Sequence, residues 1–109
     1  MILYFDMNSE IAEKVEKLKK YFENRDDILM AFLFGSYVKG SMGAESDVDV
    51  LVVGSHKAID VQSRLAKLQK KFDRDINVVD MTEQEFKKKQ TAKDPLVTRV
   101  LNGLNIKLI

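Results

Sequence analysis

The feature that most constrains the fold is an uninterrupted apolar run, Ile28–Phe34, which leads directly into Gly35. A strand with one face in water alternates apolar and polar residues, so an unbroken run indicates a strand that is buried on both faces. A sheet that contains such a strand needs a cover on each side, and helices are the usual cover. The run therefore predicts an α/β fold.

The remaining segments supply a small sheet and its helices. Two segments carry apolar residues on one helical face, and a threonine-x-x-glutamate capping box, Thr82 to Glu85, marks a later helix start. Asp94 is the expected cap of a last helix that Pro95 opens. The expected elements, in order, are helix Ser9–Glu23, strand Ile28–Phe34, strand 48–53, helix 59–72, strand 76–79, a helix after Thr82, helix 95–101 and strand 106–109. This order predicts a small mixed β-sheet flanked by helices.

Length and composition limit the classes of function. A chain of 109 residues is expected to form one domain, 1–109. The absence of cysteine excludes disulfides and thiolate chemistry, and a single histidine, His56, excludes histidine-rich zinc sites. Since His56 follows a strand and Gly54-Ser55, we expect it to be a solvated loop residue. No apolar stretch has the length of a transmembrane helix or the form of a signal peptide, so we expect no membrane association and a cytoplasmic location.

Charge is nearly balanced, with 18 basic and 17 acidic residues, so any surface that attracts nucleic acid must be local. Two basic clusters lie on expected helices. Such clusters are more often solvated helix faces, and the functional alternative is that they guide an RNA or an acidic partner. The first cluster comprises Lys87, Lys88, Lys89 and Lys93, and the second comprises Arg64, Lys67, Lys70, Lys71 and Arg74.

The chemically informative stretch begins where the first buried strand ends, at Gly35 and Ser36. A glycine-serine pair alone is more often only a turn. Here glycine allows a phosphate to approach the backbone closely, and the N–H groups that follow form an anion cradle. Ser36 adds a hydroxyl donor, and Lys39 adds positive charge about one helical turn later. The pattern indicates a phosphate-binding turn.

Two aspartates, Asp47 and Asp49, lie at the start of the second apolar run. On a strand both side chains point to one face, with Cα atoms roughly 6.5–7 Å apart. Two carboxylates on one face repel each other unless a cation lies between them, and hard oxygen ligands suit Mg²⁺. Asp49 is the harder one to explain as a surface residue, because it interrupts an apolar strand where a lone charge is costly to bury.

The stretch from Gly35 to Asp49 resembles the glycine-serine…serine-aspartate-x-aspartate signature of the DNA polymerase β-like nucleotidyltransferase superfamily. It is most similar to the minimal branch, small prokaryotic proteins often encoded beside a HEPN-domain partner in toxin–antitoxin pairs. The resemblance implies the polymerase β-like nucleotidyltransferase fold. It covers most of the chain from Ile28 onward, although the specific motif lies in the first half.

The resemblance also implies roles for individual residues. Gly35 and Ser36 would bind the β- and γ-phosphates of a nucleoside triphosphate, and Asp47 would bind metal together with Asp49. Lys39 stands where many members have arginine. Gly40 matches the family's second glycine.

The third carboxylate of active family members is the one departure from the pattern. By the resemblance its place in strand 76–79 is Asn77, whose amide can ligate a cation through oxygen but cannot accept a proton at neutral pH. Asp75 is expected to point to the same strand face as Asn77, about 6.5 Å away, whereas Asp80 is expected to point the opposite way. We hypothesise that Asp75 replaces the missing base if the strand is shifted or bulged.

Three functions remain open on the sequence alone. The first is an enzyme that moves a nucleoside monophosphate from a triphosphate to an acceptor hydroxyl of RNA or protein, with Mg²⁺. The second is a non-catalytic, antitoxin-like subunit that pairs with a HEPN-type protein, and the third is a nucleotide-sensing or structural domain. A homo-oligomer is a further option, because a small sheet must cover its edges.

Overall fold

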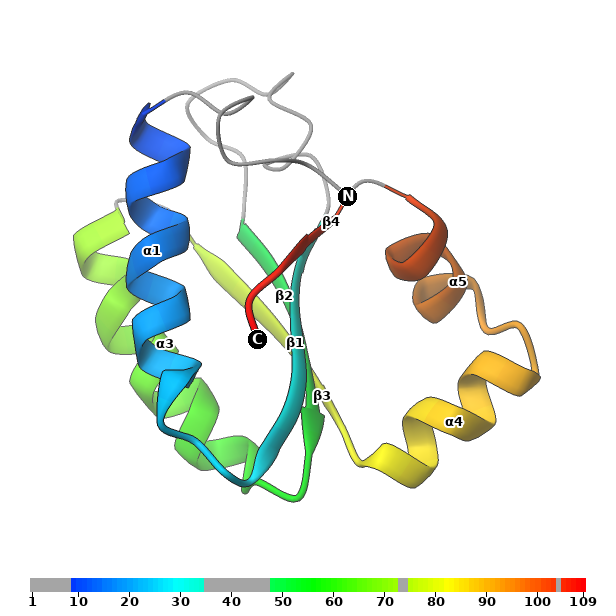
Figure 1. Cartoon of the computed structure of the whole chain (residues 1–109). Helices are drawn as coiled ribbons and strands as arrows, with labels where there is room; N and C mark the ends of the chain where they lie inside the picture. Colours follow the sequence, from blue (N-terminus) through cyan, green and yellow to red (C-terminus); the bar gives the residue numbers. More distant parts are fainter. Residues whose placement is uncertain (1–8, 35–47, 73–74, 104) are drawn as a thin grey trace.

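The computed structural model describes residues 9–34, 48–72, 75–103 and 105–109. Its elements are α1 (Ser9–Glu23), β1 (Ile28–Phe34), β2 (Val48–Gly54), α3 (Ala58–Phe72), β3 (Ile76–Met81), α4 (Glu83–Thr91), α5 (Pro95–Asn102) and β4 (Asn105–Lys107). The expected α/β fold, a mixed sheet flanked by helices, is confirmed (Figure 1). The third strand is longer than expected and ends at Met81, and the last strand is shifted to Asn105–Lys107.

The sheet has the strand order β3-β2-β1-β4. β1 is antiparallel to both of its neighbours, whereas β2 and β3 are parallel and are connected through α3. Phe34, the last residue of β1, pairs with Asp49 near the start of β2. Asp49 in turn pairs with Asn77 of β3, so these three residues form one row across the sheet.

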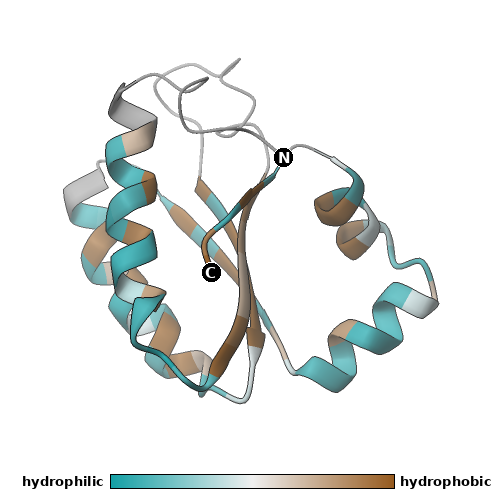
Figure 2. Ribbon diagram, viewed as in Figure 1, coloured by the Kyte–Doolittle hydropathy of each residue, from teal (hydrophilic) through white to brown (hydrophobic). Residues whose placement is uncertain are grey.

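Two helical layers bury the two faces of the sheet (Figure 1). Ala31 and Leu33 of β1 belong to the core cluster that includes residues of α1 and α3. Phe32 and Phe34 belong to the other cluster, which includes residues of α4 and α5. The alternation explains why β1 is apolar from Ala31 to Phe34, because each successive side chain there enters a different core, whereas Leu29 near the start of the strand is exposed. In Figure 2 much of the strand ribbon is coloured as hydrophobic, whereas hydrophilic and hydrophobic residues alternate along α1 and α3.

The starts of α4 and α5 are set by their caps. Thr82 Oγ1 accepts a hydrogen bond of 3.0 Å from the Glu85 N–H, and Glu85 Oε1 accepts one of 3.0 Å from the Thr82 N–H. Asp94 Oδ2 accepts from the first N–H groups of α5, which begins at Pro95. Both predicted helix starts are therefore confirmed. Across the described ranges, the helices are all too short or too polar to traverse a bilayer.

Candidate functional site

The candidate site lies where β1 ends and β2 begins, at one end of the sheet (Figure 1). Because Phe34 pairs with Asp49, the chain leaves β1 for Gly35 directly beside the Asp49 position. The other predicted phosphate- and metal-binding residues lie in the segment 35–47, outside the residues that the structure describes. They are Gly35, Ser36, Lys39, Gly40 and Asp47.

Asp49 is the one acidic residue within β2, and both of its strand neighbours, Val48 and Val50, are fully buried. It is half-buried itself, and it shares a strand face with Leu51, which packs in the core beneath α4 and α5. A carboxylate at this position needs polar partners, because partial burial penalises its charge. One such partner is Asn77 on β3, whose Nδ2 donates a hydrogen bond of 3.3 Å to Asp49 Oδ1.

Asn77, the expected counterpart of the third carboxylate, pairs with Asp49 without any distortion of the strands. The β2–β3 register is continuous from the pair Val48 and Ile76 to the pair Val53 and Met81, and Asp49 faces Asn77 within it. The shift or bulge that would bring Asp75 into this place is therefore not seen in the β2–β3 pairing. The amide can orient Asp49, but it cannot take up a proton.

Asp75 lies just before β3, and its carboxylate is engaged elsewhere. Gln69 of α3 donates from Nε2 to Asp75 Oδ1 at 3.1 Å, and its Oε1 accepts from the Ile76 N–H at 3.0 Å. Since α3 packs on the sheet face opposite to Asp49 and Asn77, this hydrogen bond turns Asp75 away from them. The expectation that Asp75 faces the same way as Asn77 is therefore wrong in the hydrogen-bonded arrangement, and its role as a base stays a prediction.

The oxygen donors near Asp49 suit a hard cation but do not complete a site for one. In the part of the chain that the structure describes, no three histidine, cysteine, aspartate or glutamate residues gather closely enough to hold a metal ion. The described donors are the Asp49 carboxylate and, after rotation of its amide, the Asn77 oxygen. These residues therefore fit Mg²⁺ only as part of a larger set to which Asp47 would contribute.

A second polar cluster, at the opposite end of β2 and β3, was not expected. The His56 side chain is only 2% exposed, and its Nε2 lies 2.6 Å from Asp80 Oδ1. Gln62 of α3 donates to the other Asp80 oxygen at 3.2 Å. The expectation of a solvated histidine is therefore wrong, because the His56–Asp80 pair is enclosed where α3 begins. The prediction that Asp80 points away from Asn77 is confirmed, because Asp80 faces α3. The available signal was Asp80 itself, an acidic residue on the α3-facing side of β3 that needs a buried partner.

Comparison with known proteins places these residues in a family context. Residues 16–99 match the model of the family described as polymerase beta, nucleotidyltransferase. A relative from Methanocaldococcus jannaschii that carries the provisional name of a protein adenylyltransferase is 39% identical over 85 residues, covering 76% of this chain and 83% of the relative. A second protein of the same organism and provisional name is 41% identical over 44 residues, covering 40% of this chain and 44% of that protein.

Solved structures show the same fold. A toxin–antitoxin complex with AMP-PNP has a chain that matches with a TM-score of 0.58 at 22% identity, over 94% of this chain and 73% of the other. A complex of a tri-AMPylated Shewanella oneidensis HEPN toxin with its MNT antitoxin matches with a TM-score of 0.57 at 19% identity, over 91% of this chain and 71% of the other. At these identities the matches establish the shared architecture.

Proposed function

Because this chain belongs to the polymerase beta nucleotidyltransferase family, we propose that it transfers a nucleoside monophosphate from a nucleoside triphosphate to an acceptor hydroxyl. In this reaction the acceptor oxygen forms a bond to the α-phosphorus, and the bond from that phosphorus to the bridging oxygen of the β-phosphate breaks. Pyrophosphate leaves, and the hydroxyl proton passes to a base or to water. The observation that carries the proposal is the half-buried Asp49, aligned with the end of β1 and with Asn77.

The two halves of the site have separate tasks in this proposal. Asp49, together with Asp47, would hold Mg²⁺, which when bound offsets the charge of the triphosphate and of the transferred phosphoryl group. Gly35 and Ser36 would hold the β- and γ-phosphates through backbone N–H groups and the serine hydroxyl, with Lys39 and Gly40 completing the turn. The pairing of Phe34 with Asp49 supports this arrangement, because the phosphate-binding turn leaves β1 beside the metal-binding carboxylate.

Asn77 has an orienting task rather than a proton-accepting one. Its hydrogen bond to Asp49 Oδ1 fixes the carboxylate plane without adding charge to the site. The base would then be Asp75, after release from Gln69, or a water molecule. In Asp75→Ala, undiminished turnover would exclude the first of these.

The names of two relatives support a choice of nucleotide and acceptor. Two relatives bear the provisional name of protein adenylyltransferases, which supports ATP as the donor and a protein hydroxyl as the acceptor. An RNA hydroxyl is the alternative acceptor, since both are oxygen nucleophiles of similar chemistry. Labelling each class of macromolecule separately distinguishes them.

The test offers each of the four nucleoside triphosphates, labelled at the α-phosphate, to the purified chain with Mg²⁺ and cell extract. We expect label from ATP to enter a protein acceptor, and Asp49→Asn to reduce the transfer at least 100-fold, within the range by which removal of electrostatic stabilisation slows catalysis. Asp26→Asn is the matched control, because Asp26 is an exposed turn residue just before β1, at the opposite end of the sheet from Asp49. Absence of label from all four nucleotides would contradict the proposal.

A second function, that of an antitoxin-like subunit pairing with a HEPN-type partner, is favoured by Asn77 and by the fold shared with MNT antitoxins. The partner would be sought by co-expression with the product of the adjacent gene. If Asp49→Asn leaves both the complex and neutralisation of the partner unchanged, binding alone explains the effect. If neutralisation is lost while the complex persists, the effect is enzymatic.

A further inference from the structure

A basic groove runs between α1 and α3, on the sheet face opposite to Asp49 and Asn77. Both helices bury most of their apolar side chains in the core below, so the residues between them at the surface are mainly polar. The cavity has a volume of about 400 Å³. We call it the helix groove, and its lining residues are Lys17, Lys20, Tyr21, Arg64, Lys67 and Leu68. Four of these six side chains are cationic and none is acidic.

Tyr21, one of the residues that line the helix groove, contacts two arginines. Arg25 donates from Nη1 to the Tyr21 hydroxyl at 2.9 Å, and its guanidinium carbon lies 5.7 Å from the Tyr21 ring centroid. Arg64 of α3 lies 5.9 Å from the same centroid. Arg25 is also fixed by ion pairs with Asp27 and Asp60, at 2.9 and 2.8 Å. Tyr21 of α1 therefore contacts α3 through Arg64, and of the two arginines it is Arg64 that lines the groove.

The cations of the helix groove are poorly compensated. Lys17 lies 3.7 Å from Glu13, a loose contact between two exposed side chains. Among the described residues, no carboxylate lies within ion-pair distance of Lys20, Arg64 or Lys67. Concentrated positive charge of this kind attracts a multivalent anion from solution.

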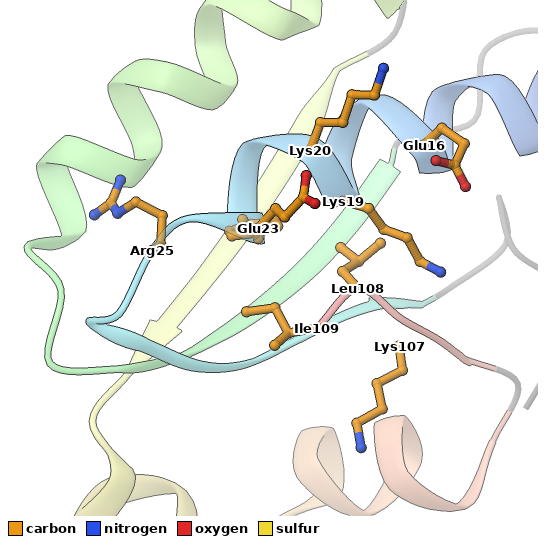
Figure 3. A pocket seen from close by; sticks show the side chains of 9 residues that line it. Glu16, Lys19, Lys20, Glu23, Arg25, Lys107, Leu108 and Ile109 are labelled. Carbon is orange, nitrogen blue, oxygen red and sulfur yellow. The ribbon is translucent and has the colours of Figure 1, made fainter.

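A neighbouring groove on the other side of α1 shows the contrast. It lies between α1 and β4, and Figure 3 shows its lining, in which Glu16 and Glu23 accompany the basic residues. Arg25, although it lines this groove, extends toward α3 (Figure 3) and is neutralised by Asp27 and Asp60. Mixed charge therefore makes this groove a weaker anion site than the helix groove.

We propose that the helix groove binds the phosphodiester backbone of a nucleic-acid strand. Lys17 and Lys20 on α1, and Arg64 and Lys67 on α3, each stand about one helical turn apart, so the cations form two rows with a rise of about 5 Å. A phosphodiester backbone carries one charge at every nucleotide, and such a regular line of charge suits paired rows of cations. The contacts are to phosphate, so binding is independent of base sequence.

An acidic protein surface is the less suitable occupant. Stable protein interfaces are centred on desolvated aromatic or aliphatic anchors and are depleted in lysine. The helix groove offers only Tyr21 and Leu68 as apolar lining, and both are already partly packed on the core. Lysine-rich lining without an apolar centre is the composition of a nucleic-acid footprint.

The helix groove and the candidate nucleotide site lie on opposite faces of the sheet, so the inference does not rest on the proposed transfer activity. A strand in the groove would leave the Asp49 end of the sheet open. Nucleic acid could then be bound by a chain that is active or inactive as a transferase, and the two properties can be measured separately.

Fluorescence anisotropy with labelled single-stranded RNA of mixed sequence, and with DNA of the same sequence, tests the inference on the full chain. With four phosphate contacts to a single strand, the slope of log K against log salt is about −3, so binding weakens roughly 50-fold between about 50 and 200 mM salt. We expect Lys20→Gln combined with Lys67→Gln to weaken binding at least about tenfold and to halve the slope. Binding of both RNA and DNA identifies the phosphodiester backbone that they share as the ligand. Binding of RNA alone identifies RNA as the nucleic acid that supplies this backbone.

The matched control is Lys88→Gln with Lys93→Gln, which removes the same charge from exposed positions at α4. We expect this variant to bind as the unchanged chain does, and circular dichroism verifies that both double variants are folded. The proposal is overturned if neither strand binds, if the control weakens binding equally, or if a labelled polyglutamate peptide binds more tightly than either strand.

Discussion

Replacement of Asn77 by aspartate would place two carboxylates face to face at the end of the sheet. Asn77 now donates to Asp49 Oδ1 at 3.3 Å, and the β2–β3 register holds the two backbones in direct pairing. In Asn77→Asp this donor becomes an acceptor with negative charge. Because the strand pairing fixes both Cα positions, the side chains can separate only by rotation.

The expected loss of stability follows from the distance. Coulomb's law for unit charges 3.3 Å apart gives about 5 kcal/mol at an effective dielectric constant of 20 and about 1.3 kcal/mol at that of water. Asn77 is exposed and Asp49 half-buried, so the repulsion lies toward the lower value. Adding about 1 kcal/mol for the lost hydrogen bond, we expect a total of roughly 2–3 kcal/mol, or about 10 °C in Tm.

Thermal unfolding followed by circular dichroism, first in EDTA and then with Mg²⁺, measures this effect. Gln90→Glu is the control, since it makes the same amide-to-carboxylate change at an exposed position on α4. We expect Mg²⁺ to restore most of the lost Tm in Asn77→Asp, because a cation between the carboxylates relieves their repulsion. We also expect transfer activity to rise, since a base at this position contributes about 100-fold or more.

The pH dependence gives an independent check of the same reasoning. Repulsion from Asp49 raises the pKa of the introduced carboxyl above its value in the unfolded chain. The folded variant then holds its proton more tightly, so the stability deficit is present at neutral pH and shrinks as pH falls through the raised pKa. An Asn77→Asp protein that unfolds at the same temperature as the unchanged chain in EDTA, or whose deficit is unaffected by both Mg²⁺ and acid, would refute the proximity of the two side chains.

Other changes test the fold. In Gly54→Ala the added Cβ would lie 2.8 Å from a backbone Cα of β1, and urea titration should show a loss of about 1–3 kcal/mol or more; an unchanged midpoint would contradict this packing. Thr82→Ala should cost about 1 kcal/mol by loss of the cap, in the same assay. The Thr82 N–H lowers the pKa of Glu85 in the folded chain. The Glu85 carboxylate therefore stabilises the fold at pH values above its pKa in the unfolded chain. This stabilisation is lost as the pH falls through the lower pKa of the folded chain. Glu85→Gln should therefore have a different free energy of unfolding from the unchanged chain at pH 7, and the two values should converge in acid. Asp80→Ala would leave the buried His56 ring without its hydrogen-bonding partner. Urea titration should then show a free energy of unfolding that is lower by about 1–3 kcal/mol. A smaller loss would contradict the enclosure of the pair.

The elements were predictable where local patterns decide the conformation. The apolar run of β1 and the caps Thr82 and Asp94 each act over a few residues, and each was confirmed. The pairing of β1 with β4 was not predicted, because it joins residues that are far apart in the chain and the local pattern does not name the partner strand.

The site was predictable in part for the same reason. Asp49 stands out from an apolar strand, so its unusual position is visible without coordinates. The partners of His56 and Asp75 depend on where α3 packs, which strand periodicity does not specify. Gln69 and Gln62 were therefore missed as hydrogen-bonding partners, although both lie on α3 beside these residues.

The position of β4 has a consequence for synthesis of the chain. β1 lies inside the sheet, yet its partner on one side is β4 (Asn105–Lys107), which is translated after all the other described strands. Until that segment leaves the ribosome, one hydrogen-bonding edge of β1 is unpaired, and an apolar strand with an open edge can recruit a second chain. The nascent protein is therefore most exposed to misassembly after β1 has emerged and before β4 has followed it, and chaperone contact with β1 would matter most in that interval.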